Sequence, residues 1–156
     1  MNLAELTART GLDVLDHLET QVAIPVLDGL QAQGDLLVIP FDVVADAVIP
    51  PTDDRWRPVP HAGIEVLRGA AGGNPHTLTA EHGTCHWTDD ATDHERLTLG
   101  MLCATRPVYL IHPEHGASGI APGMYVIRRQ RERAMENRRR WTGTNFSADP
   151  DRYIAD

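Results

Sequence analysis

Hydrophobic positions in the first 18 residues recur at roughly helical spacing. The repeated residue is leucine, at Leu3, Leu6, Leu12, Leu15 and Leu18. Gly11 interrupts the pattern, so the spacing predicts either one short helix or two broken helices. Acidic residues occupy polar positions of the same segment, at Asp13, Asp16 and Glu19. The segment is therefore expected to form an amphipathic flap that packs against the body of the protein or against a partner.

The pattern then changes to short apolar runs that are typical of β-strands. Gly34 and Asp35 form a turn signal before the run 36–39, which Pro40 ends, and this arrangement predicts a buried strand. Residues 49–60 are rich in proline and predict a loop. Beyond the loop, glycine-punctuated runs predict strands at 64–67, 77–79, 84–87, 97–102, 108–111 and 124–128. This punctuation favours a mainly β fold, either a small barrel or a sandwich.

The strand expected at 124–128 shows a two-residue alternation. Tyr125 and Ile127 alternate with Met124, Val126 and Arg128. The alternation predicts that one face of this strand is buried and that the other turns outward.

Length and composition fit one domain. The chain has 156 residues, of which 42% are hydrophobic, enough for a single modest core. We divide it into an N-terminal helical flap (1–32), a β domain (33–128) and a basic, partly helical C-terminal extension (129–156). Apolar runs are far shorter than the ~20 residues that span a bilayer, which predicts no membrane association. The absence of a secretory-type start and the presence of only two cysteines favour the reducing cytoplasm.

Positive charge is concentrated near the C-terminus although the formal net charge is −8. Residues 128–140 contain seven arginines and two glutamates, which leaves the rest of the chain strongly acidic. An acidic body repels a polyanion, so any contact with phosphate is expected in this segment alone. The arginines have three candidate targets, namely an acidic face of the same body, an acidic protein partner and RNA. The candidate partner-binding residues are Arg128, Arg129, Arg131, Arg133, Arg138, Arg139 and Arg140.

Histidine is enriched, and most of the eight histidines lie between His76 and His115. His112 and His115 follow a predicted strand directly, and His76 belongs to a different strand. Because neutral imidazole is a common ligand, these three residues predict a metal site, with zinc as the first candidate ion. Glu114 would be a fourth ligand or a base acting on a metal-bound water. The alternative is that these histidines face solvent or cap turns.

The remaining candidate chemistry is sparse. Cys85 lies beside His86 and is a soft ligand, a nucleophile or a buried structural thiol, whereas Cys103 is expected in the core. The chain has no glycine-rich nucleotide loop, no P-loop and no lysine, which excludes Schiff-base and Walker-type chemistry. A nucleophile elbow of the Gly-x-Ser-x-Gly type is also missing.

The order of the elements resembles a group of small uncharacterised bacterial and phage-associated proteins. The resemblance rests on the opening Gln33-Gly34-Asp35-Leu36-Leu37, on His112-Pro113-Glu114-His115, and on a closing run Pro122-Gly123-Met124-Tyr125-Val126-Ile127-Arg128-Arg129-Gln130-Arg131-Glu132. Where that group has two histidines in a mid-chain turn, this chain has Asn74 and His76. The resemblance implies a shared fold, but it supplies no activity and no substrate.

These observations lead to three functional hypotheses. The first is a small cytoplasmic β-rich protein with a histidine-based metal site, whether or not it is an enzyme. The second is a non-enzymatic assembly or accessory protein that docks on a protein partner, or on a second copy, through the leucine flap and the arginine segment. The third is RNA binding by the arginine segment.

Overall fold

The computed structural model describes residues 1–16, 18–68 and 73–130. The fold is mainly β, as expected, with one α-helix, α1 (Leu3–Thr10), and two short 3-10 turns, η1 (Phe41–Val43) and η2 (Asp53–Arg55). The strands are β1 (Val26–Leu27), β2 (Gln31–Gln33), β3 (Leu36–Pro40), β4 (Val48–Ile49), β5 (Arg57–Pro58), β6 (Ile64–Arg68), β7 (Pro75–Thr79), β8 (Cys85–Thr88), β9 (Thr92–Asp93), β10 (Thr98–Ala104), β11 (Val108–His112), β12 (Gly116–Ile120) and β13 (Gly123–Arg129).

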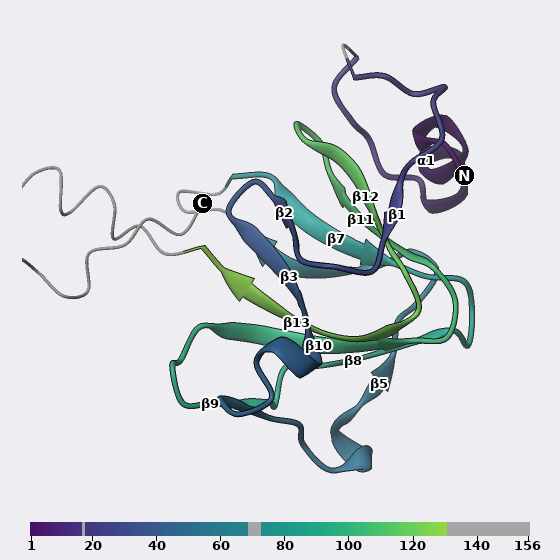
Figure 1. Ribbon diagram of the computed structural model, residues 1–156. Helices are drawn as coiled ribbons and strands as arrows, with labels where there is room; N and C mark the ends of the chain where they lie inside the picture. The colour runs from purple at the N-terminus through teal and green to yellow at the C-terminus, as the bar shows by residue number, and fades with distance from the viewer. Residues whose placement is uncertain (17, 69–72, 131–156) are drawn as a thin grey trace, which may run out of the picture.

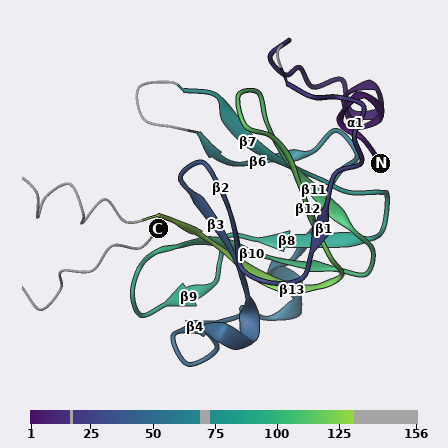
Figure 2. The same ribbon diagram turned by 45° about the horizontal axis from the view of Figure 1, so that its top comes forward.

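Two large sheets form a sandwich (Figures 1 and 2). One has the order β1-β12-β11-β7-β6 and the other has the order β2-β3-β13-β10-β8-β5. The main core lies between them and takes Leu78 and Leu110 from the first sheet and Leu36 and Leu102 from the second. The described strands do not close into a barrel, so of the two architectures considered the sandwich is confirmed.

A smaller core covers the other face of the six-stranded sheet. Val48 of β4 packs with Met101 and Val126, in a unit that includes the two-stranded sheet β4-β9. As a result, four consecutive residues of β13, Tyr125 to Arg128, are buried. The prediction of an outward-turned face on this strand is therefore wrong for Val126 and Arg128 and holds only for Met124, which is exposed. Alternation in the sequence does not reveal that a second layer covers part of this face.

The N-terminal helix is the short one of the two alternatives. Asn2 and Glu5 form a capping box, and Gly11 ends the helix with φ +73°. Leu3 and Leu6 are buried against the body, so the predicted amphipathic packing is confirmed for this turn of the chain. None of the helices in the described part of the chain is long and apolar enough to cross a membrane.

All seven predicted strands correspond to observed strands, but β1, β2, β4, β5, β9 and β12 were not predicted, and β12 is the longest of these. Its sequence, Gly-Ala-Ser-Gly-Ile, has little hydrophobic signal. The small residues are required by a close approach, since a Cβ on Gly119 would lie 2.5 Å from the carbonyl oxygen of Pro25, next to β1. The predicted loop at 49–60 also contains η2 and the short strand β5.

Candidate metal centre

The structure brings the three predicted histidines together. His76 lies on β7, His112 ends β11, and His115 lies in the turn that leads to β12. The ring centroids of His76 and His112 are 4.4 Å apart, and those of His112 and His115 are 4.5 Å apart. His76 and His112 are buried, whereas His115 is exposed. The cluster therefore has two inner imidazoles and one at the surface.

Strand pairing explains this arrangement. β7 pairs with β11, and β11 continues through a tight hairpin into β12, in which His112 is opposite Gly116. Inside that hairpin, Nδ1 of His112 accepts hydrogen bonds from the backbone N–H groups of Glu114 and His115, at 3.1 and 3.3 Å. His112 thus holds the shape of the turn that presents Glu114 and His115 to solvent.

A third segment, the turn between β2 and β3, completes the site. The side chain of Gln33 is buried, and its amide nitrogen donates to the carbonyl oxygen of Leu110 at 2.8 Å and to Oγ of Ser118 at 3.1 Å. A backbone carbonyl can only accept, so these bonds fix the orientation of the amide. Its oxygen Oε1 then faces Nδ1 of His76 at 2.9 Å. His76 must therefore carry a proton on Nδ1.

Asp35, in the same turn, faces the other nitrogen of His76. Its Oδ1 lies 3.1 Å from Nε2. Burial lowers the pKa of His76, as do the nearby His112 and His115, and Asp35 only partly opposes this shift. A neutral ring with its proton on Nδ1 has a lone pair on Nε2. The neutral form of His76 thus directs a lone pair at a carboxylate.

The pKa of His112 is also lowered, first by burial and then by His115, while Glu114 and a hydrogen bond with the backbone of Asn74 oppose the shift. Both inner histidines are therefore biased toward the neutral form near pH 7. Neutral imidazole is the form that binds metals.

Gly34 allows the turn to approach the rings. Its φ is +58°, and a Cβ at this position would lie 2.8 Å from Nε2 of His115 and 3.4 Å from Cε1 of His76. Only glycine accommodates both the backbone conformation and the contact. The β2–β3 turn, His76 and His115 consequently meet at one point of the surface.

The hairpin itself offers a group of possible ligands. His112, Glu114 and His115 each have a ligand atom within 4.8 Å of the other two, so this group could hold a metal ion. Oε1 of Glu114 accepts a hydrogen bond from the amide nitrogen of Asn74 at 3.2 Å. Asn74 thus orients the glutamate.

Comparison with known proteins places the domain in a family. Residues 32–130 match the model of a family described as a domain of unknown function, DUF8820, and this range is more than half of the chain. The chain belongs to the DUF8820 family. No curated protein and no solved structure matches it.

The DUF8820 match includes every residue of the centre described above, and it leaves out α1 and the chain beyond residue 130. Sequence reasoning missed two of these residues as functional candidates, Gln33 and Asp35, which it used only as a turn signal and as part of a motif. The sequence feature that could have identified them is a turn glycine, Gly34, flanked by the polar residues Gln33 and Asp35. That signal does not reveal which strand the turn faces.

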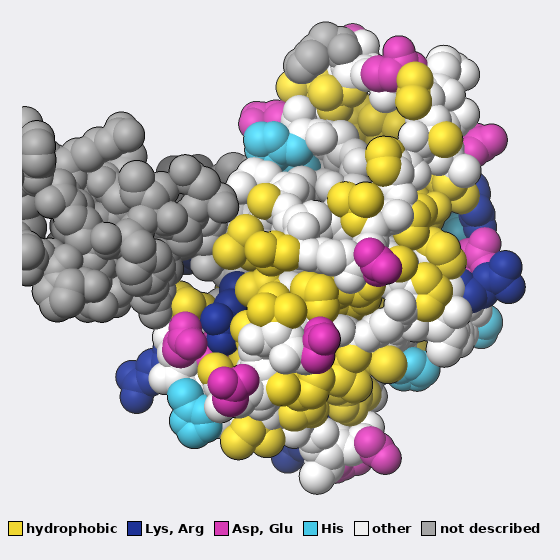
Figure 3. All heavy atoms as spheres, in the orientation of Figure 1, with side chains coloured by type: hydrophobic (Ala, Val, Ile, Leu, Met, Phe, Trp, Pro, Cys, Tyr) yellow, Lys and Arg dark blue, Asp and Glu magenta, His cyan; other side chains and the backbone are white. Residues whose placement is uncertain are grey.

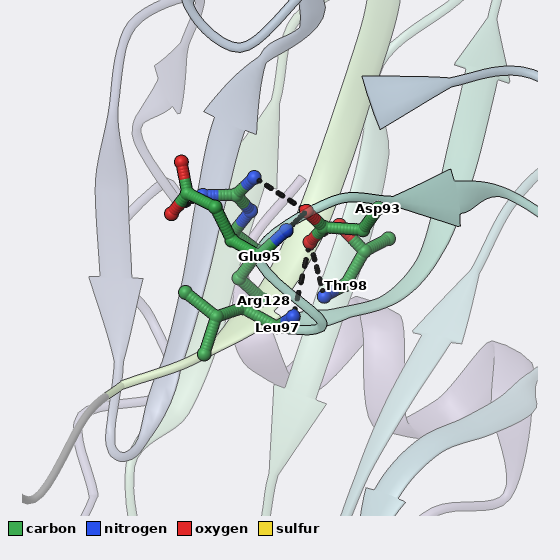
Figure 4. A network of polar contacts seen from close by, with 5 residues as sticks. All are labelled: Asp93, Glu95, Leu97, Thr98 and Arg128. Carbon is green, nitrogen blue, oxygen red and sulfur yellow. Dashed lines mark hydrogen bonds and ion pairs between the residues drawn. The ribbon is translucent and has the colours of Figure 1, made fainter. Parts of the chain in front are cut away.

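The arginine candidates have different positions. Arg128 is buried on β13 and bonds to Asp93 and Glu95 (Figure 4), so it serves the acidic body of its own domain and is not free for a partner. Arg129 is exposed. The other five, Arg131, Arg133, Arg138, Arg139 and Arg140, lie outside the described residues. On the face in Figure 3, the described arginines stand apart among acidic and hydrophobic side chains and form no continuous basic surface.

The two cysteines differ in environment. Cys85 is fully buried, and burial raises the pKa of its thiol to about 12, so it is a structural thiol. Cys103 is half-buried on the opposite side of the six-stranded sheet. The prediction that Cys103 belongs to the core is therefore wrong, because its strand is covered only in part on that side.

Proposed function

We propose that this DUF8820 domain binds a divalent transition-metal ion, with zinc as the first candidate, through His76, Asp35 and His115. The observation that carries the proposal is the contact between Nε2 of His76 and Oδ1 of Asp35 at 3.1 Å. In the neutral ring, Gln33 holds the proton on the opposite nitrogen, so that two electron-pair donors then face each other, whereas a protonated ring would donate to Asp35 in an ion pair.

A cation resolves this repulsion. A proton would do so only by charging His76, which burial and the neighbouring His112 and His115 disfavour. A metal ion bound by both atoms turns the repulsion into coordination. Two ligand atoms held about 2.1 Å from one zinc at a tetrahedral angle are about 3.4 Å apart, close to the observed separation.

The surroundings of His76 support the same assignment. Metal-binding histidines commonly donate their second N–H to an oxygen, which fixes the tautomer and the ring orientation. Gln33 provides that oxygen for His76. His115 is the third ligand in our proposal, because its Nε2 lies 2.8 Å from the position above Gly34 that Cε1 of His76 approaches to 3.4 Å. The ring centroids of His76 and His115 are 6.3 Å apart, so the exposed His115 ring must turn toward the ion to bind it.

Our ligand set leaves out His112. The lone pair on its Nδ1 already accepts two backbone hydrogen bonds, and binding a metal there would break the hairpin turn. The competing donor set is His112, Glu114 and His115. In our proposal Glu114 is the neighbouring acid–base group, since two histidines and one carboxylate leave a coordination position for water.

The test is metal content measured by elemental analysis, with zinc affinity from competition against a chromophoric chelator. The full chain, purified without added metal, is expected to carry close to one zinc. Asp35→Asn and His115→Ala should each lower the affinity by on the order of 100-fold, since the loss of a residue that only orients a metal ligand already costs about 10–100-fold. The exposed residues Asp46 and His82 provide matched controls, Asp46→Asn and His82→Ala, which should leave affinity unchanged.

Two results would contradict the proposal. One is a wild-type chain that binds no zinc at micromolar concentration. The other is an Asp35→Asn variant that keeps full affinity while His112→Ala abolishes binding, which would assign the ion to the competing donor set instead.

A further inference from the structure

A second group of metal-ligating side chains lies across the six-stranded sheet, away from the histidine cluster. Cys103 of β10 pairs in register with His86 of β8 on one side and with Met124 of β13 on the other. β8, β10 and β13 are neighbours in the sheet (Figure 1). Side chains directly opposite each other on antiparallel strands share a face, with Cβ atoms about 4.5–5.5 Å apart. The three residues thus form a row, the His86–Cys103–Met124 row.

The row points away from the main core. Its sequence neighbours Trp87, Leu102 and Tyr125 are part of that core, and side chains alternate along a strand. His86 and Met124 are exposed and Cys103 is half-buried. The three side chains are therefore accessible from one side of the sheet.

A cavity lies over this part of the sheet, between the row and the proline-rich segment. It has a volume of about 340 Å³ and is lined by the row together with Pro50, Pro51, Asp53 and Trp56. The prolines have no N–H groups to donate, and Trp56 adds an apolar ring. One side of the cavity is thus a wall of the proline-rich segment, and the other is a row of sulfur and imidazole donors.

We propose that the His86–Cys103–Met124 row binds a soft monovalent metal ion, Cu(I). A thiolate and a thioether are the protein ligands that select Cu(I), and imidazole is also a good ligand for copper. A thiolate neutralises the single charge of Cu(I). A neutral complex is far less costly than a bare ion to hold beside an apolar wall.

The donor types separate this site from the histidine centre. The zinc proposal uses nitrogen and carboxylate oxygen, and it contains no sulfur ligand. The row holds two sulfur atoms, and among the described residues Asp53 is the one carboxylate that lines its cavity. Cys85, whose thiol is buried on the core side of β8, is not accessible to the cavity and serves as an internal control.

The experiment is an anaerobic titration of the full, zinc-free chain with Cu(I) in competition with a chromophoric Cu(I) chelator. We expect one tight Cu(I) per chain. Cys103→Ser should weaken binding by on the order of 100-fold, and Met124→Leu and His86→Gln by about 10-fold each, in the range that changes around metal sites produce. The matched controls Met101→Leu and His82→Gln should bind as the wild type does, because Met101 is in the smaller core and His82 is outside the row.

Alkylation provides a second measurement that does not depend on the folding of a variant. In the folded wild type, iodoacetamide should modify Cys103 and spare Cys85, and the modified chain should lose Cu(I) binding. Retained wild-type affinity in Cys103→Ser or in the alkylated chain would overturn the proposal, as would an equal effect of Met101→Leu and Met124→Leu. The variant Asp35→Asn should keep Cu(I) binding, so failure of the zinc proposal is distinguishable from failure of this one.

Discussion

Nη2 of Arg128 lies 3.3 Å from Oδ1 of Asp93, and the two side chains expose 7% and 4% of their surfaces (Figure 4). The same carboxylate accepts hydrogen bonds from the backbone N–H groups of Glu95, Leu97 and Thr98 and from the hydroxyl of Thr98. Asp93 thus connects the loop between β9 and β10 to the buried end of β13.

Replacement of Asp93 should be strongly destabilising. Asp93→Asn leaves the buried guanidinium of Arg128 without its buried counter-charge, and Nε of Arg128 already has no hydrogen-bond partner among the described residues. Breaking a buried ion pair on one side costs about 3–5 kcal/mol. Glu95 pairs with the same guanidinium but is half exposed, so Glu95→Gln should cost about 1 kcal/mol or less. Urea denaturation measures both, and equal costs would contradict this assignment.

Asp93 should also contribute to acid sensitivity. Burial alone would raise its pKa, but the hydrogen bonds from Thr98, Glu95 and Leu97 together lower it below the ordinary value of 3.8. A carboxyl with a lowered pKa in the folded state stabilises the fold above its unfolded pKa, and this contribution is lost as the pH falls through the folded value. The free energy of unfolding of the wild type should therefore fall below about pH 4 more steeply than that of Asp93→Asn. Parallel curves for the two proteins would exclude this role.

Gly34 should be more sensitive to substitution than another glycine of similar backbone conformation. Gly34 and Gly11 have φ of +58° and +73°, but a Cβ on Gly11 meets nothing within 4 Å, whereas one on Gly34 would press on His115. Gly11→Ala should cost about 1–2 kcal/mol from the left-handed conformation alone. Gly34→Ala should cost more and should also weaken zinc binding, which chelator competition would detect. A Gly34→Ala variant with the stability and zinc affinity of Gly11→Ala would show that the turn does not need to approach the rings.

Gly119 should be required for the attachment of β1. A Cβ added to Gly119 would lie 2.5 Å from the carbonyl oxygen of Pro25, so that oxygen would have to move. A Cβ added to Gly29 would meet nothing within 4 Å. In Gly119→Ala, the backbone N–H of Ala121, which donates to Leu27 of β1 at 2.9 Å, should exchange with solvent faster than in the wild type or in Gly29→Ala. Unchanged protection of Ala121 would mean that the edge adapts without detaching.

Hydrophobic periodicity in the sequence was sufficient to locate seven of the strands that supply the cores, since runs such as 36–39 and 108–111 are apolar enough that most of their side chains are buried. It failed for β12, where small residues such as Gly119 are selected by a close approach to another segment. It also failed for the covered faces of β13 and β10, because burial of Val126 and partial burial of Cys103 depend on β4 and η2. Local pattern cannot specify which distant segment covers a strand.

The candidate site divides in the same way. His112 and His115 could be found because they belong to one short motif, and His76 because it follows a glycine- and proline-containing turn on a different predicted strand. Asp35 was recognisable only as a turn residue and Gln33 only as part of a motif, since their meeting with His76 depends on how the two sheets pack. The sequence can therefore identify candidate ligands within one hairpin. The hydrogen-bond partners that fix the tautomer of His76 are found only in the tertiary structure.

Gln33 gives the sharpest test of that last point. Its amide nitrogen bonds to Leu110 and Ser118 and its oxygen fixes the proton of His76. Gln33→Leu removes the oxygen that holds the proton of the neutral His76 ring on Nδ1. The proton can then move to Nε2 and form a hydrogen bond with Asp35, and a protonated Nε2 has no lone pair with which to bind a metal. Zinc affinity should fall by about 10–100-fold, the usual effect of losing such a partner.

Gln31→Leu is the matched control, because Gln31 also donates to a backbone carbonyl, that of Gly119, but does not contact the rings. Nitrogen chemical shifts of His76 in the metal-free protein report the tautomer directly. A wild type protonated on Nε2, or a Gln33→Leu variant that binds zinc as tightly as Gln31→Leu does, would remove the basis for assigning His76 and Asp35 as ligands.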